Sequence, residues 1–121
     1  MIAFLTAVTE KAGPSARYLH FGMTSSDLLD TALGLTLRRA GMQLRSGLVD
    51  LREIVRRRAL EFKDRACVGR THGIIAEPTT FGLKLLGFYT ELERQRERLD
   101  TAIADAAVGK ISGAVGTFAH L

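Results

Sequence analysis

The feature that most limits the fold is a long stretch without proline, from Ser25 to about Lys63, whose apolar residues recur at helical spacing. The pattern steps by threes and fours through Leu33, Leu37, Ala40, Leu44, Leu48, Leu51, Val55 and Phe62, with Arg58 filling the gap position between the last two. At about 1.5 Å per residue, an unbroken helix of this length would reach roughly 57 Å. Because that is too long for a compact domain of 121 residues, the pattern predicts one helix of an extended bundle.

A second helical pattern runs from Pro78 to about Val108. Its apolar seam alternates steps of four and three, as in a heptad repeat, through Phe81, Leu85, Phe88, Leu92, Gln95, Leu99, Ala102 and Ala106. No strand pattern is apparent, so the predicted fold class is all-α. We expect a long helix over about 25–63, a catalytic loop over 64–77 and a long antiparallel helix over about 78–108. Two helices cannot cover their own apolar faces, so self-association is expected.

The two ends of the chain look different from this helical hairpin. Helical spacing from Ile2 to Lys11 stops at Gly13-Pro14. We expect residues 1–23 to be the end of an N-terminal segment with a connecting loop, and residues 24–121 to be part of a central helical-bundle domain. Residues 109–121 are rich in glycine, which predicts a turn that can approach a ligand.

Composition restricts the classes of partner. The 46% hydrophobic content argues against disorder, and the net charge of +4, from 17 basic and 13 acidic residues, suits a small acidic ligand. No aromatic residues interleave with the basic ones, so nucleic-acid binding is not expected. The single cysteine allows no intrachain disulfide. Without a signal-peptide pattern or an apolar run near the ~18 residues of a membrane span, we predict no membrane contact and a cytoplasmic location.

The clearest candidate for chemistry is His72, in the run Gly69-Arg70-Thr71-His72-Gly73. The flanking glycines let the backbone come close to a ligand, and Pro78 suits the first turn of the next helix. Imidazole transfers protons near neutral pH, so we interpret His72 as a proton donor or acceptor facing a small anionic substrate. Spacing alone leaves open the alternative of a structural histidine.

A second candidate stretch is Thr24-Ser25-Ser26-Asp27, with His20 just before it. Thr24 and Asp27 have the spacing of a capping box, which would make them a helix start and nothing more. However, free N–H groups, hydroxyls and the positive end of a helix dipole also form an anion site. The pattern alone supports both interpretations. The three histidines, His20, His72 and His120, lack the spacing and cysteine company of a zinc site, so no metal is predicted.

Three runs in order resemble the motifs of the adenylosuccinate lyase family, part of the fumarase/aspartase superfamily: Leu19–Asp27, Gly69–Gly82 and Gly109–Thr117. The resemblance implies a lyase of purine biosynthesis. Such a lyase eliminates fumarate from adenylosuccinate, giving AMP, and from the succinylated aminoimidazole carboxamide ribotide. It works by general acid/base catalysis without metal or organic cofactor. His72 matches the family's general acid, Thr24 and Ser25 match substrate-binding residues, and His20 matches a second histidine that contacts or orients the substrate.

The resemblance also implies a homotetramer whose helices form a central bundle and whose active sites are shared between subunits. Family chains are several-fold longer, and the loop of type Ser-Ser-x-Met-Pro-x-Lys-x-Asn-Pro that carries the general-base serine does not occur in these 121 residues. We therefore expect a central fragment of such a subunit, inactive alone. Ile75 stands where many members have a second histidine.

Two rival interpretations remain open at this level. A related superfamily lyase, of the argininosuccinate lyase or carboxymuconate cycloisomerase type, shares the fold and a version of the motifs. The chain could also be a non-catalytic helical oligomerisation module.

Overall fold

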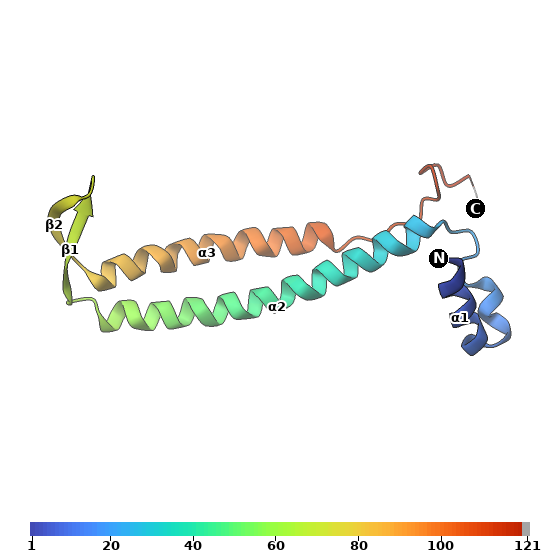
Figure 1. Cartoon of the computed structure of the whole chain (residues 1–121), viewed down its shortest axis with the longest axis horizontal. Helices are drawn as coiled ribbons and strands as arrows, with labels where there is room; N and C mark the ends of the chain where they lie inside the picture. Colours follow the sequence, from blue (N-terminus) through green and yellow to red (C-terminus); the bar gives the residue numbers. More distant parts are fainter. Residues whose placement is uncertain (120–121) are drawn as a thin grey trace. The chain divides into compact units, whose positions relative to one another are not determined.

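The computed structural model describes residues 1–119 (Figure 1). In chain order its elements are α1 (Ile2–Ala12), the 3-10 helix η1 (Pro14–Tyr18), α2 (Ser25–Glu61), β1 (Ala66–Thr71), β2 (Ile74–Thr80) and α3 (Phe81–Ala106). The chain forms two compact units, one made of residues 1–38 with those from Ala106 onward, the other of Arg39–Asp105. His120 and the end of the predicted turn over 109–121 lie outside the described residues. The predicted boundary between residues 23 and 24 stays a prediction.

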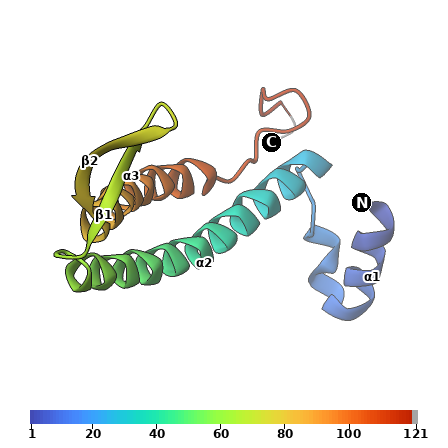
Figure 2. The same ribbon diagram turned by 60° about the vertical axis from the view of Figure 1, so that its left-hand side comes forward.

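The all-α prediction holds only in part. Helices dominate, as the periodicity predicts. The segment predicted as a loop, over 64–77, instead contains β1 and the first part of β2, which form an antiparallel hairpin (Figure 2). Its catalytic role stays a prediction. Two residues, His72 and Gly73, connect the strands, with φ angles of 54° and 76°. Positive φ at both central residues is what a type I′ turn requires, and this turn matches the natural twist of a hairpin.

Pro78 is also placed differently from its prediction. It lies in β2, opposite Val68, rather than in the first turn of a helix. The helix α3 begins three residues later, where the Leu83 N–H donates to the Thr80 hydroxyl at 3.1 Å. Thr80 therefore caps the helix, because its side chain satisfies one of the N–H groups that a helix start leaves unpaired.

Within the second unit, α3 lies antiparallel beside the C-terminal part of α2 (Figure 1). Gly82 forms the closest contact: its N–H donates to the Phe62 carbonyl at 2.9 Å, and it is buried. A Cβ atom added there would lie 2.6 Å from the Lys63 Cα and closer still to the Ala59 carbonyl oxygen. The start of α3 can approach α2 this closely only because residue 82 has no side chain.

The glycines inside α2 have two different roles. A Cβ atom on Gly41 would lie 2.5 Å from the Ile103 side chain, and one on Gly34 would lie 2.6 Å from the Val108 carbonyl oxygen. A Cβ atom on Gly47 would meet nothing within 4 Å. Gly34 and Gly41 thus permit close packing, whereas Gly47 does not contribute to it.

Polar contacts join α2 and α3 beyond these glycines. Arg52 pairs with Glu93, and its guanidinium also donates to the Tyr89 hydroxyl at 3.1 Å. Arg45 pairs with Asp100 at 2.5 Å. The basic residues of α2 are therefore partly neutralised by carboxylates of α3, which weakens any interpretation of this helix as a free cationic surface. Each such half-exposed pair adds little to stability.

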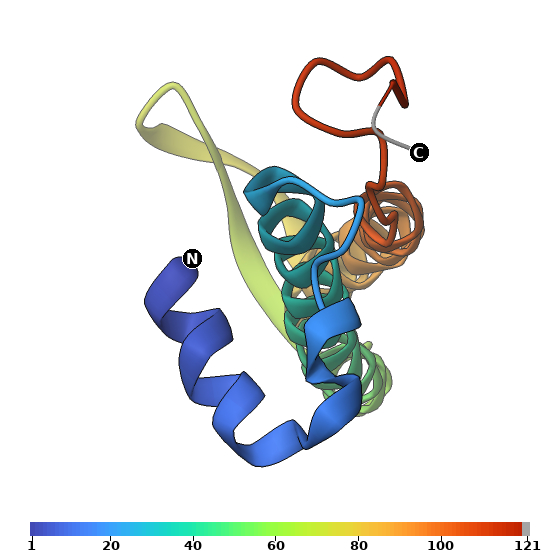
Figure 3. The same ribbon diagram turned by 90° about the vertical axis from the view of Figure 1, so that its right-hand side faces the viewer.

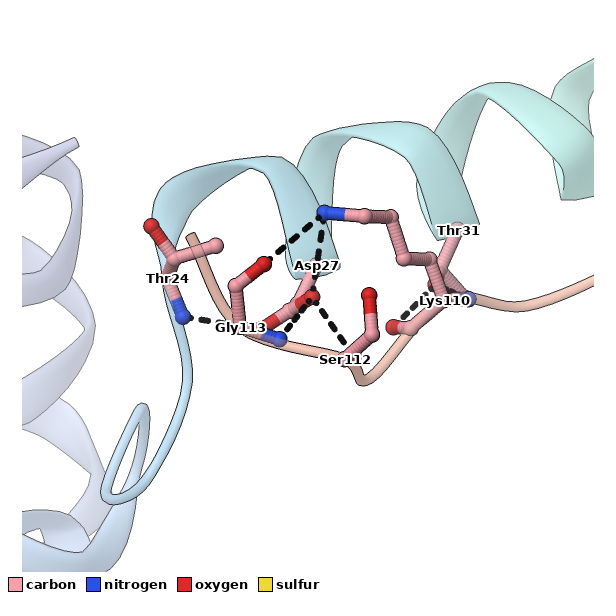
Figure 4. Close-up of polar contacts among 6 residues, drawn as sticks. All are labelled: Thr24, Asp27, Thr31, Lys110, Ser112 and Gly113. Atoms are coloured by element: carbon pink, nitrogen blue, oxygen red, sulfur yellow. Dashed lines mark hydrogen bonds and ion pairs between the residues drawn. The ribbon is translucent and has the colours of Figure 1, made fainter. Parts of the chain in front are cut away.

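In the first unit, α1 and η1 form a bent pair of short helices (Figure 3), and Ala16 of η1 is buried. The contact that organises the rest of this unit is the carboxylate of Asp27, which is completely buried. It accepts hydrogen bonds from the N–H groups of Thr24 at 2.9 Å, Ser112 at 3.1 Å and Gly113 at 3.2 Å (Figure 4). The Lys110 ammonium lies 3.3 Å from the same carboxylate. Asp27 thereby ties the start of α2 to a segment that follows α3.

These contacts favour the ionised form of Asp27. The hydrogen bond from the Thr24 N–H lowers the pKa of Asp27 most strongly, burial opposes the change, and Lys110 and Gly113 lower the pKa further. The folded protein therefore binds a proton at Asp27 less readily than the unfolded chain does. By linkage, the ionised carboxylate stabilises the fold above the ordinary pKa of an aspartate, and this stabilisation is lost as the pH falls toward the lower folded-state pKa.

The Gly82 contact can be tested with a matched glycine in the same helix. A Cβ atom on Gly87 would meet nothing within 4 Å in the chain. We expect Gly87→Ala to raise the free energy of unfolding by roughly 0.5–1 kcal/mol, because alanine favours a helix. Gly82→Ala should lower it by about 1–3 kcal/mol, because backbone atoms must move apart. Denaturant unfolding of the chain followed by circular dichroism measures both, and an equal effect at the two positions would contradict the close contact.

The Asp27 contact predicts a dependence on pH. The protection factors of the Ser112 and Gly113 amides against hydrogen exchange should be high at neutral pH. They should fall as the pH drops below about 4. In Asp27→Asn these amides should exchange quickly throughout. Asp30→Asn is the control, because Asp30 lies exposed on the same helix. Protection that is independent of Asp27 and of pH would show that the carboxylate does not hold this segment.

Candidate active site

The predicted site residues belong to two different units. His20, Thr24 and Ser25 lie in the first unit, at and before the start of α2, whereas His72 lies in the second, at the hairpin turn.

His72 is exposed at the turn between β1 and β2. Its Nδ1 lies 2.8 Å from the Thr71 hydroxyl. This contact holds one ring nitrogen, so that the opposite nitrogen, Nε2, is the one available to a substrate. If Nδ1 accepts from the Thr71 hydroxyl, the neutral ring carries its proton on Nε2.

The hairpin that carries His72 contains an irregularity close to the turn. Arg70 pairs with Ile75 and Val68 with Pro78, so that Gly69 alone faces two residues of β2, including Glu77. A Cβ atom on Gly69 would collide with the Glu77 carbonyl oxygen. Such a bulge increases the local twist and re-aims the residues beyond it. The glycine before Arg70 therefore shapes the strand that ends at His72.

The structure supports part of the capping interpretation at Thr24. The Thr24 N–H donates to the Asp27 carboxylate, as in a capping box. The Thr24 hydroxyl points away from that carboxylate (Figure 4) and has no hydrogen-bond partner among residues 1–119. Ser25 is the first residue of α2, and both side chains are half-buried. Capping therefore does not use up the hydroxyls at this helix start.

His20 has two unusual features. Its φ angle is 70°, a left-handed conformation that costs a side-chain-bearing residue free energy. Its Nε2 atom is buried without a hydrogen-bond partner in the described part of the chain. A buried polar atom without a partner is unfavourable, and its occurrence beside a candidate site is typical of a group that meets a ligand.

The sequence interpretation missed the role of Asp27 and Lys110. Asp27 was recognised only as a helix-start residue, and Lys110 only as part of a glycine-rich turn. The contacts of Asp27 with Ser112 and Gly113 join residues 85 and 86 positions apart. No local pattern signals such a contact, because helix periodicity and turn propensity concern near neighbours only.

The described residues show neither a metal-binding cluster nor a membrane-spanning helix. No group of three or more His, Cys, Asp or Glu side chains within residues 1–119 is placed to hold a metal ion. No helix in the described part of the chain is long and apolar enough to cross a membrane. What the residues do offer is a helix start with spare hydroxyls, of the kind to which anions can bind, and an imidazole held through one ring nitrogen.

Known adenylosuccinate lyases are similar to the whole of this chain. Adenylosuccinate lyases from Aquifex aeolicus and Bacillus subtilis are each 46% identical over all 121 residues, and the one from Synechocystis is 49% identical. The chain spans only 28% of the length of these relatives.

Solved lyase structures have a similar fold over nearly the whole of this chain. A fumarate lyase from Mesorhizobium matches with a TM-score of 0.93 and 30% identity, over 98% of this chain and 28% of the other. A 3-carboxy-cis,cis-muconate lactonizing enzyme from Pseudomonas putida matches with a TM-score of 0.88 and 35% identity, over 98% and 27%. A family profile described as "Lyase" matches residues 1–121. Because that match covers the whole chain, the chain belongs to this lyase family.

Proposed function

We propose that this chain forms the substrate-binding and proton-donating part of an enzyme that eliminates fumarate from adenylosuccinate and from the succinylated aminoimidazole carboxamide ribotide. The identities of 40–49% to adenylosuccinate lyases, over the whole chain or all but one residue of it, support this substrate class. The chain covers 27–28% of those proteins, so we propose that it acts as the central part of a longer subunit.

The reaction requires two proton transfers. A base removes a proton from the succinyl carbon next to the one that bears nitrogen, the carbon–nitrogen bond breaks as the double bond of fumarate forms, and an acid protonates the departing nitrogen. We assign the second transfer to His72, through Nε2, because Thr71 holds Nδ1. The base, a serine in the family that the motifs resemble, would come from outside these 121 residues.

The backbone conformation of His72 carries this assignment. At the first central position of a type I′ turn, asparagine or glycine is more favourable than histidine. The chain nevertheless has histidine there, and its side chain is exposed. A residue kept at a conformational cost in an accessible turn is better explained by function than by packing.

The helix start of α2 is proposed to bind the anionic part of the substrate. Thr24 and Ser25 would offer hydroxyls and the positive end of the helix dipole to a phosphate or carboxylate. His20 would donate or accept through its unpartnered Nε2. No cofactor is required by this scheme.

We also propose that each active site combines elements of different subunits of a homotetramer. Many apolar side chains of α2 and α3 stay exposed, including Leu44 at 67% and Phe88 at 50%. Patches of this kind mark surfaces that bind another protein chain. A 37-residue helix separates Thr24 from the hairpin along the chain, so a helix start from one copy and a hairpin from another can supply one site.

A second candidate function is that of a carboxymuconate cycloisomerase, which the 35% identity to the lactonizing enzyme from Pseudomonas putida favours. The higher identities to adenylosuccinate lyases favour fumarate elimination. Turnover of adenylosuccinate and of carboxymuconate by the same complete protein distinguishes the two. The most direct protein for such assays is a complete lyase subunit carrying these 121 residues, for example the Bacillus subtilis relative with its matching segment replaced.

The proposed role of His72 predicts that a substitution at this position lowers activity without lowering stability. In the complete enzyme, His72→Asn should lower kcat for adenylosuccinate by roughly 10²–10⁴-fold, because a general acid is lost. Since asparagine tolerates the left-handed conformation, the free energy of unfolding should stay constant or rise by up to about 1 kcal/mol. Thermal unfolding and an absorbance assay of fumarate formation measure the two effects.

The control for this variant is Gly73→Ala. The φ angle of 76° at Gly73 makes alanine strained, so this variant should lose stability while it retains the imidazole. If His72→Asn kept kcat within a factor of three of the wild type, His72 would be a turn residue and the proposed role would be wrong.

Shared active sites predict complementation between two inactive variants. One variant carries His72→Asn, and the other carries Thr24→Val with Ser25→Ala. When the two are unfolded together and reassembled, random mixing should restore both wild-type elements in about a quarter of the sites. Activity of the mixture at the level of the separate variants would show that one subunit supplies both elements.

A further inference from the structure

The first turns of α2 have a row of residues that all contact the segment after α3. Asp27, Thr31 and Gly34 follow one another by four and three positions, so they lie on the same face of the helix. The Thr31 hydroxyl accepts from the Lys110 N–H at 2.9 Å, and it lies 3.2 Å from the Lys110 carbonyl oxygen. Gly34 admits the Val108 carbonyl oxygen. Residues 108–113 are therefore held along this face.

Asp27 differs from the other two members of the row because it also contacts the candidate site. One of its carboxylate oxygens accepts from the N–H of Thr24, and the other accepts from the N–H of Ser112 (Figure 4). The Gly113 N–H lies 3.2 Å from both oxygens. A single buried side chain thus holds the residue that begins the anion-binding helix start and the segment that returns beside it.

The charge of Asp27 is compensated within the same cluster. The Lys110 ammonium lies 3.3 Å from Oδ1 and donates to the Gly113 carbonyl oxygen at 3.4 Å. A completely buried carboxylate is tolerated when hydrogen bonds and an opposite charge satisfy it. Because of this pairing, the cluster does not present a bare negative charge to an anionic substrate at Thr24 and Ser25.

We propose that Asp27 is a positioning residue for the substrate-binding helix start, which it holds in a binding-competent arrangement by tying Thr24 to Ser112 and Gly113. Asp27 does not touch the substrate; it acts through Thr24. This inference rests on the proposed function of that helix start in binding the anionic substrate.

Asp27→Asn is the informative substitution. Asparagine has the same shape but only one acceptor oxygen, and its amide group would face N–H donors that the carboxylate now satisfies. In the complete lyase subunit carrying these 121 residues, we expect KM for adenylosuccinate to rise by roughly 10–100-fold while kcat stays within about threefold, because binding geometry is lost and proton transfer by His72 is not. The pH profile of kcat should be unchanged.

A merely structural role gives a different result. Loss of folded protein would lower the maximal rate in proportion to the inactive fraction and leave KM unchanged. Asp30→Asn is the matched control, an exposed aspartate on the same helix that should keep both constants. If Asp27→Asn does not fold, Lys110→Gln replaces it. This variant removes only the compensating charge and should raise KM by about 3–10-fold.

The outcomes separate this inference from the proposed function. The inference alone is overturned if the wild-type enzyme turns over adenylosuccinate and the KM of Asp27→Asn stays within twofold of the wild-type value. The same criterion applies to Lys110→Gln where that variant is used. An equal rise of KM in Asp30→Asn also overturns it. A wild-type enzyme without any turnover of adenylosuccinate overturns the proposed function and this inference together.

Discussion

Two long helices lying side by side cannot bury the apolar residues that both of them carry, and the rest of the structure follows from this shortage of cover. Among residues 1–119, Ala16 is the one buried apolar side chain apart from glycine positions. The helix pair is instead brought together by glycines that allow close approach, such as Gly41 and Gly82, and by pairs such as Arg52 with Glu93. The uncovered apolar area is what association with further helices would bury.

The candidate site accepts local costs that a purely structural segment would avoid. His20 and His72 both have left-handed backbones, which favour glycine or asparagine. Asp27 is a completely buried charge, whose desolvation is offset by three N–H groups and by Lys110. Phe118, in the segment after α3, has a left-handed backbone as well. The costs at His20, His72 and Asp27 fall near the helix start and at the hairpin turn, the two places where the proposed chemistry needs orientation. Backbone strain and buried charge are often found at functional sites.

The two long helices were predictable because their apolar residues repeat at a helical period over many turns. The hairpin was not predicted, since its strands are only six and seven residues long and none of their residues is fully buried. Short strands without a buried face give only a weak alternation of apolar and polar residues. A usable signal was present in the dipeptide His72-Gly73, with Thr71 before it and Ile74 and Ile75 after it, because a turn residue followed by glycine between β-branched residues favours a two-residue hairpin turn.

By itself, the sequence determined where the long helices run and which polar residues are candidates for chemistry, because periodicity and capping act between neighbours. Only the tertiary structure decided how these residues are used. The capping role of Asp27 could be read locally, but its hydrogen bonds to Ser112 and Gly113 depend on a segment more than 80 residues away. The direction of the His72 ring comes from a contact with its neighbour Thr71, in a turn whose conformation the helical periodicity does not reveal. Contacts such as those of Asp27 arise only when distant segments meet, and no local pattern encodes them.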